Sequence, residues 1–275
     1  MKTILIPTDF SVPEQNAAYY ALHLAKVLEA NLTLCHAFTV PSEVTVPQLG
    51  WPLYEYATMK ESTIKQLALF ADKLKTRFRN DPDTKSAPLP VISCESEVGT
   101  VSDMIHKLVR DPAENMIVSN HLINHVQVPI LLIPAETKFG SIKRIAFATD
   151  FNNKDIAVIR ALTSFAARYD ADLVITNVKD EWVNEEEHRQ KEHLFLDKLI
   201  VEINYPKFYM RHITEIDIDE GLQLLSSEYK IDLVVMVHKK MAMLDRLLVG
   251  SHTRALAKHI KIPLLVIPEN LHPDF

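Results

Sequence analysis

A short apolar run that ends in Thr-Asp-Phe occurs twice in this chain of 275 residues. It reads ILIPTDFS in residues 4–11 and IAFATDFN in residues 145–152, which places Asp9 and Asp150 141 positions apart. The same offset aligns three further pairs: Ala25 with Ala166, Leu32 with Leu173 and Ala37 with Val178. Agreement at one offset over this length indicates that a whole structural unit is repeated.

The ends of the two units also match, at shorter offsets. ENMIVSN in residues 114–120 aligns with IDLVVMV in residues 231–237 at an offset of 117, and HVQVPILLIP in residues 125–134 aligns with HIKIPLLVIP in residues 259–268 at 134. A chain of this length is long enough for about two domains. We therefore predict two domains, at residues 1–137 and 141–275, joined near Gly140.

Apolar periodicity alternates between strands and helices within each unit. In the first unit, strands are predicted at residues 4–7, 31–37, 90–95, 115–119 and 129–134, and helices at residues 18–25, 56–79 and 100–109. The second unit repeats this order. Short apolar strands separated by helices predict an α/β fold, in which each unit is a doubly wound parallel sheet of five strands covered on both faces.

The last predicted strand of each unit is apolar and bracketed by prolines: VPILLIP in residues 128–134 and IPLLVIP in residues 262–268. An exposed apolar edge strand promotes aggregation unless it is paired. We expect these two strands to pair antiparallel, so that one chain resembles a dimer. The alternative is that each is an ordinary core strand of an independent domain.

Charge and composition argue against several classes of protein. A net charge of -6 and a pI near 6.1 provide no basic surface for nucleic acid or an anionic membrane. The apolar run at the start of the chain is too short for a signal peptide. No apolar run approaches the roughly 18 residues of a membrane span. We expect a cytoplasmic protein. Cys35 and Cys94 are far apart and lie in strand-like runs, so we expect two small buried side chains without redox or metal chemistry.

Asp9 and Asp150 each follow the first strand of a unit, where doubly wound sheets bind ligands beyond the carboxyl ends of their strands. A carboxylate there can accept hydrogen bonds from a ligand amine or hydroxyl. The alternative is structural: each Asp caps the following helix or forms its turn, with Ser11 or Asn152 sharing that role.

Several motifs together resemble the universal stress protein family. They are PTDFS and ATDFN after the first strands, HAF and NVKD after the second, LVVMVHKK after the fourth, and LVGSHTRALAKHIKIPLLVIP near the end. The resemblance covers almost the whole chain as two tandem domains. It implies a cytoplasmic stress-response protein with strand order 3-2-1-4-5 and domains paired through their last strands. The pairing makes the chain an intramolecular pseudo-dimer and leaves a homo-oligomer open. Some family members bind ATP and others do not.

In the nucleotide-binding members, the first-strand Asp and the backbone after the second strand hold the adenine base. The resemblance assigns these roles to Asp9 and Ala37 in the first unit, and to Asp150 and Val178 in the second.

The phosphates of such members rest on a loop of the form G-x2-G-x9-G-[ST]. The second unit keeps the last part of this loop as Gly250, Ser251 and Thr253, but Val237 and Lys240 stand at the first two glycine positions. A Cβ at these positions hinders close approach of the backbone to an anion. Three cations, Lys239, Lys240 and Arg246, argue the other way because they lie near the expected phosphates. ATP is thus the cofactor that the resemblance implies for the second unit only.

The first unit has lost this loop altogether. The change of offset from 117 to 134 means that 17 residues, equivalent to His238 through Arg254, are missing between Asn120 and His121. Two explanations are open: a true deletion with a shortened last helix, or a mobile loop left out of the sequence as read. The clean excision of one loop favours the second explanation. In either case, the first unit as written cannot hold a triphosphate in the family manner.

No enzyme or metal motif is present. His121 and His125 are four residues apart on an expected helix, but a third ligand and the glutamate of an HExxH motif are lacking. Walker and G-x-S-x-G sequences do not occur. The sequence therefore predicts a non-enzymatic stress-response protein that binds or senses a small ligand. The alternatives are an interaction module that binds no nucleotide, with unknown protein partners, and a slow ATPase.

Overall fold

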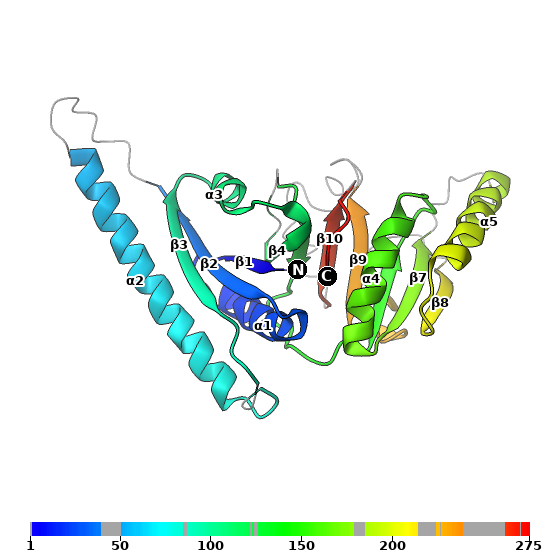
Figure 1. Cartoon of the computed structure of the whole chain (residues 1–275), viewed down its shortest axis with the longest axis horizontal. Coiled ribbons are helices and arrows are strands. Elements are labelled where there is room, and N and C mark those ends of the chain that lie inside the picture. Colours follow the sequence, from blue (N-terminus) through cyan, green and yellow to red (C-terminus); the bar gives the residue numbers. More distant parts are fainter. Residues whose placement is uncertain are drawn as a thin grey trace.

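The chain folds around one continuous β-sheet (Figure 1), as a computed structural model shows. The structure describes residues 2–39, 51–84, 87–121, 123, 126–178, 185–213, 224–225, 227–238, 262–269 and 271–275. Within these ranges, no helix has both the length and the apolar character needed to cross a bilayer.

The sheet has ten strands in the order β3-β2-β1-β4-β5-β10-β9-β6-β7-β8. The first unit contributes β1 (Thr3–Pro7), α1 (Val12–Leu28), β2 (Asn31–Phe38), α2 (Trp51–Asn80), β3 (Ile92–Val98), α3 (Val101–Leu108), a short 3-10 turn η1 (Pro112–Glu114), β4 (Asn115–Ser119) and β5 (Ile130–Leu132). The second contributes β6 (Arg144–Ala148), α4 (Asp155–Tyr169), β7 (Asp172–Val178), α5 (Glu185–Glu202), β8 (Phe208–Ile213), β9 (Leu233–His238) and β10 (Leu264–Pro268). Each half has the predicted strand order 3-2-1-4-5.

Strands within each half are parallel, and the halves meet where β5 and β10 pair antiparallel. Leu132 lies opposite Leu264 and Leu131 opposite Leu265 in this pair. The prediction that the two apolar end strands pair with each other is confirmed. Pairing removes what would otherwise be an exposed apolar edge on each half.

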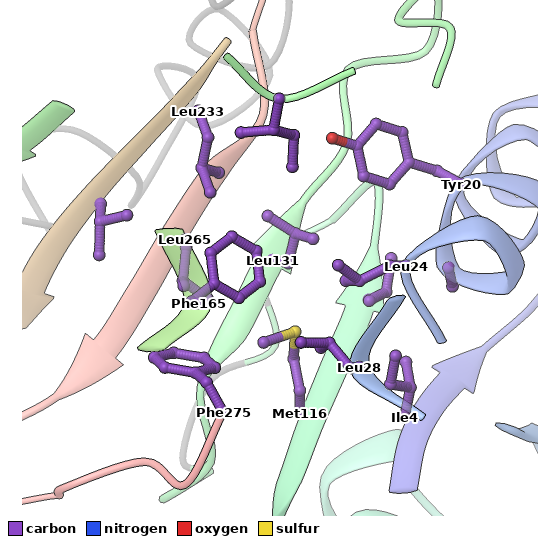
Figure 2. Packing of buried hydrophobic residues seen from close by; sticks show 14 of the residues in the cluster. Ile4, Tyr20, Leu24, Leu28, Met116, Leu131, Phe165, Leu233, Leu265 and Phe275 are labelled. Atoms are coloured by element: carbon purple, nitrogen blue, oxygen red, sulfur yellow. The ribbon is translucent and has the colours of Figure 1, made fainter. Parts of the chain in front are cut away.

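The central strands of the sheet are buried on both faces. In β1, Ile4 and Ile6 belong to one apolar cluster, while Leu5 between them belongs to another on the opposite face. This alternation follows from the two-residue period of a strand. The larger cluster runs through both halves (Figure 2), where α1 and α4 also touch through a hydrogen bond from Arg168 to the carbonyl of Val27. The two units thus share one core.

The helix after each Thr-Asp-Phe motif ends without glycine. Glu29 follows α1 and Asp170 follows α4, 141 positions apart, and both take left-handed backbone angles with φ of 53° and 52°. In each cap the backbone N–H bonds to a carbonyl of the last turn. A chain with 5 glycines must use other residues where a helix needs a left-handed end.

Two expectations for the end of the first unit are wrong. Asn120 and His121 are consecutive in the full sequence and lie in one bend, where the His121 N–H bonds to Ser119 Oγ at 3.0 Å. The 17-residue segment is therefore truly absent. The expected short helix is also missing from the described residues between 120 and 129, and His125 lies outside them.

Candidate functional site

The Thr-Asp-Phe motif forms the same tight turn in both units. Phe10 and Phe151 each have a positive φ of 63°, which is unfavourable for a bulky residue. The preceding threonine stabilises the turn, because Thr8 Oγ1 accepts the Phe10 N–H at 3.0 Å and Thr149 Oγ1 accepts the Phe151 N–H at 2.9 Å. The repeated motif therefore has a structural role in both units, because its threonine stabilises the turn.

A side chain from the second strand stabilises each turn from the other side. His36 Nδ1 lies 2.6 Å from the carbonyl of Thr8, and Asn177 Nδ2 donates to the carbonyl of Thr149 at 2.7 Å. His36 and Asn177 occupy equivalent positions at the offset of 141. Both residues begin motifs that were quoted from the sequence, HAF and NVKD, but they were assigned no role there. Comparing polar residues at that offset would have indicated them.

Asp9 and Asp150 are exposed at the carboxyl ends of β1 and β6. Asp9 Oδ1 accepts the N–H of Ser11 at 2.9 Å. Burial raises the pKa of the Asp9 carboxyl, but hydrogen bonds from Ser11 outweigh this effect, and the pKa lies below its ordinary value. The helix caps are other residues, Ser11 for α1 and Lys154 for α4. Neither aspartate is therefore an N-cap, but the structural alternative holds in part: Asp9 forms the turn, Ser11 caps α1, and Asn152 Oδ1 accepts the N–H of Lys154 at 3.0 Å.

The backbone of the second strand faces the same corner. The Cys35 carbonyl accepts the N–H of Thr8, so the N–H and C=O of Ala37, two residues on, point to the same side, past the end of β1. Thr176 bonds to Thr149 in the same way, which directs the backbone of Val178 past the end of β6. In each unit, an exposed aspartate and the backbone of the second strand therefore lie at the carboxyl end of the sheet.

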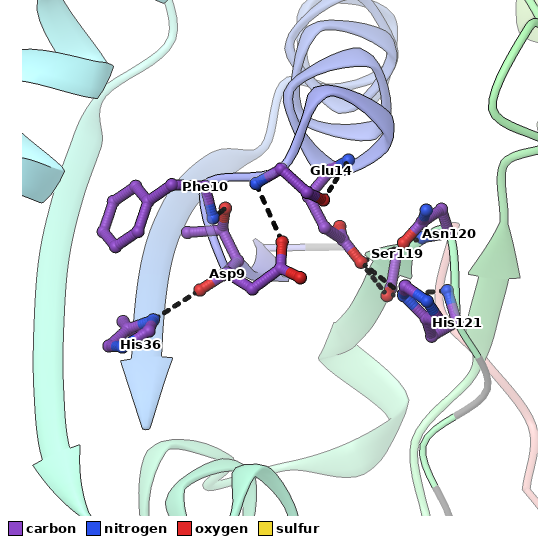
Figure 3. A network of polar contacts seen from close by, with 9 residues as sticks. Asp9, Phe10, Glu14, His36, Ser119, Asn120 and His121 are labelled. Carbon is purple, nitrogen blue, oxygen red and sulfur yellow. Dashed lines mark hydrogen bonds and ion pairs between the residues drawn. The ribbon is translucent and has the colours of Figure 1, made fainter. Parts of the chain in front are cut away.

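A second acidic residue lies under the corner of the first unit. Glu14, in the first turn of α1, is only 3% exposed. Its Oε1 accepts hydrogen bonds from Ser119 Oγ at 2.9 Å and from the Asn120 N–H at 3.3 Å, and lies 3.2 Å from His121 Nδ1. Figure 3 shows these contacts between the start of α1 and the end of β4. Sequence reasoning did not single out Glu14.

The second unit has a buried acid at the equivalent position. Asp155 follows Glu14 by 141 positions and is 2% exposed. Its Oδ2 accepts a hydrogen bond from Thr149 Oγ at 2.7 Å. The shorter side chain thus bonds to the Thr-Asp-Phe turn of its own unit, whereas Glu14 bonds to the end of β4.

The phosphate-loop residues of the second unit, Gly250, Ser251 and Thr253, lie outside the described residues, as do Lys239, Lys240 and Arg246. Val237, at the first glycine position, belongs to β9 and pairs with Ile267 of β10. For the second unit, the described residues therefore include those assigned to the base, Asp150 and Val178, but not those assigned to the phosphates.

A cavity of about 800 Å³ lies elsewhere, between α1, the end of α2 and the segment that joins the units. Its wall holds a cluster in which Tyr19 donates to Asp81 Oδ2 at 2.6 Å and the Arg77 guanidinium lies 3.6 Å from the Tyr19 ring centroid. His23 stacks on Phe139 with ring centroids 4.5 Å apart. The contacts of Tyr19 link α1 to the end of α2, and the contact of His23 holds the joining segment against α1.

Replacing His23 by phenylalanine should reduce the loss of stability on acidification. Burial holds the pKa of His23 below its usual 6.5, although Asp81 Oδ2 lies 3.8 Å from its Nε2. The unfolded chain then binds a proton that the folded chain excludes, so stability is complete above pH 6.5 and falls as the pH drops below it. One such group contributes at most ~1.4 kcal/mol per pH unit.

Urea unfolding at several pH values between 5 and 8 measures this effect as the difference between the two proteins. His193→Phe is the matched control, because His193 is exposed on α5. Equal pH dependence of wild type and His23→Phe would contradict the assignment.

No group of three or more potential metal ligands occurs among the described residues. Cys35 is buried, Cys94 is half-buried, and both are free thiols. The polar geometry at the strand ends consists of carboxylates, backbone amides and hydroxyls, which recognise a ligand by hydrogen bonds.

Comparison with protein families gives one result. The family described as the Universal stress protein family matches residues 1–119 and again residues 141–268. Comparison with curated proteins gave no significant match.

Among solved structures, a universal stress protein from Archaeoglobus fulgidus DSM 4304 is similar over 97% of this chain and 96% of its own, with 12% identity and a TM-score of 0.59. A functionally unknown protein, PA1789 from Pseudomonas aeruginosa PAO1, is similar over 100% and 93%, with 11% identity and a TM-score of 0.55. A universal stress protein in complex with cAMP covers 46% of this chain and 98% of its own, with 17% identity and a TM-score of 0.35. At these identities, the two likenesses that span the whole chain show the shared fold.

Proposed function

This chain is a tandem member of the universal stress protein family, and from that premise we propose that it is a cytoplasmic stress-response protein that senses an adenine nucleotide without turning it over. The second unit holds the nucleotide. Asp150 and the backbone of Val178 take the base, and Gly250, Ser251 and Thr253 take the phosphates.

The observation that supports this proposal most is the rigid strand-end corner of the second unit. Asp150 is exposed there, on a turn fixed by the bonds that Phe151 and Asn177 make to Thr149. A carboxylate at this position can accept a hydrogen bond from the amine of adenine, and a backbone N–H of the strand end can donate one to a ring nitrogen. Holding those groups in place before binding lowers the ordering cost of the complex.

Calorimetric titration of ATP and Mg²⁺ into the whole protein tests the proposal. We expect wild type to bind, and Asp150→Ala to weaken binding by about 10- to 100-fold, because a charged hydrogen bond of roughly 1.5–3 kcal/mol is lost. Gly250→Ala should weaken it as well. Glu136→Gln, an exposed acid between the units, removes one charge elsewhere and is the matched control.

Absence of heat with wild type would remove the nucleotide proposal, and binding that survives both Asp150→Ala and Gly250→Ala would place the site elsewhere. Release of phosphate from saturated protein over hours would favour a slow ATPase instead.

A second candidate is an interaction module that binds no nucleotide. It is favoured by α5, where three apolar side chains are exposed: Leu194 at 63%, Ile200 at 71% and Val201 at 84%. Exposed apolar side chains grouped on one helix suit contact with a protein partner. This candidate predicts no heat in the ATP titration.

A further inference from the structure

Glu14 contacts the residue of the first unit that is equivalent to the first glycine position of the phosphate loop. At the offset of 117, Asn120 is equivalent to Val237, the residue at the first glycine position of the phosphate loop. The backbone N–H of Asn120 donates to Glu14 Oε1 at 3.3 Å. An amide at the start of the phosphate corner is therefore already bound to an anion, and that anion belongs to the protein.

The neighbouring groups reinforce this arrangement. Ser119 Oγ donates to the same oxygen at 2.9 Å, and His121 Nδ1 lies 3.2 Å from it (Figure 3). A hydroxyl, an amide and an imidazole nitrogen are the kinds of group that bind phosphate oxygens. Because the 17-residue loop is absent, Asn120 leads directly to His121, and these groups converge on one carboxylate.

The other carboxylate oxygen of Glu14 also acts against a ligand phosphate at this position. Glu14 Oε2 is buried and has no hydrogen-bond partner within the described part of the chain. A carboxylate with one oxygen unpaired in a buried setting is weakly screened and repels a second anion strongly. A ligand phosphate at the end of β4 would meet this charge and would also find its donors occupied.

The base side of the same corner is formed by Asp9 and Ala37. Asp9 is exposed, and the backbone of Ala37 points past the end of β1. The first unit therefore combines groups suited to an uncharged heterocycle with a built-in anion where the phosphates would lie. A site that places an unpaired charge against one ligand discriminates against that ligand.

We propose that Glu14 takes the place of a ligand phosphate, so that the strand-end corner of the first unit binds an uncharged purine nucleoside and rejects its phosphate esters. The inference rests on the proposed function in one respect, that a strand-end corner built from an Asp and the backbone of the second strand holds a purine base. It differs in its ligand and in its unit. At the equivalent position of the second unit, Asp155 Oδ2 accepts a hydrogen bond from Thr149 in the turn.

The test compares adenosine with AMP in the whole protein carrying Asp150→Ala, which weakens binding by the second unit. We expect this protein to bind adenosine at least about tenfold more tightly than AMP. Adding Glu14→Gln should strengthen AMP binding by about tenfold and change adenosine binding by less than about twofold, since the amide keeps the hydrogen-bonding shape and loses the charge. Glu136→Gln in the same background should leave the ratio of the two affinities unchanged.

Adenosine binding reports that the corner is intact in each variant. If Glu14→Gln does not fold, Glu14→Asp replaces it, because a side chain shortened to that of Asp155 draws the carboxylate away from Asn120. Equal affinities for adenosine and AMP in the Asp150→Ala protein would overturn the proposal, as would a ratio that neither Glu14 variant changes. No adenosine binding in that protein would overturn it too, and loss of ATP binding between wild type and Asp150→Ala would still support the proposed function of the second unit.

Discussion

Phe165→Ala should lower the free energy of unfolding by about 3–5 kcal/mol, the usual cost of removing a large aromatic side chain from a core. Phe165 in α4 is 1% exposed and packs edge-to-face on Phe275, with ring centroids 5.3 Å apart. Figure 2 shows it among Leu131 and Leu265, which come from the two paired end strands. The cavity would therefore open where the two units share their core.

Urea unfolding followed by circular dichroism measures the loss, with Leu194→Ala on α5 as the control because Leu194 is 63% exposed. We expect the control to change stability by less than about 0.5 kcal/mol. Since one apolar cluster contains residues of both units, we also expect a single transition in wild type and in the variant. Two separate transitions in wild type would show that the units unfold independently and would contradict the shared core.

The fold could be predicted from the sequence because its strongest signals are repeated. Each unit carries the same order of apolar runs, and the doubly wound sheet and the pairing of residues 130–132 with 264–266 followed from these patterns, whereas the strand order was implied by the family resemblance. Apolar burial is a property of each segment by itself, so sequence periodicity detects it. Prolines that bracket both end strands gave a second, independent signal.

The polar geometry of the corner could be predicted only in part. Asp9 and Asp150 were located at the strand ends, but Glu14 follows Pro13 at the start of a helix and looks like an ordinary first-turn acid in the sequence. Its partners at 119–121 are about a hundred residues away, and only the tertiary structure brings them to the first turn of α1. The 17-residue segment that the first unit lacks was interpreted as a mobile loop for a related reason. The sequence alone does not reveal that Glu14 occupies the place where such a loop would bind a phosphate.

The threonines of the repeated motif form different hydrogen bonds in the two units, although their sequence context is nearly the same. Thr149 Oγ accepts the Phe151 N–H at 2.9 Å and donates to Asp155 Oδ2 at 2.7 Å. Thr8 Oγ accepts the Phe10 N–H at 3.0 Å, and Glu14 bonds to Ser119 instead. One hydroxyl therefore stabilises a turn and a buried acid, and the other stabilises a turn.

Thr149→Val should accordingly lower the free energy of unfolding by about 3–5 kcal/mol, and Thr8→Val by about 1–2 kcal/mol. Valine preserves the shape of threonine, so both variants lose the acceptor of an N–H at positive φ. Only Thr149→Val also removes a hydrogen bond to a buried carboxylate, which contributes roughly 1.5–3 kcal/mol. Urea unfolding of both variants gives the two losses. Asp155→Asn completes a double-mutant cycle, in which Thr149→Val should cost less once the carboxylate is an amide. Equal losses for Thr149→Val and Thr8→Val, or a cycle without coupling, would show that Asp155 does not depend on this hydroxyl and that the two turns are energetically alike.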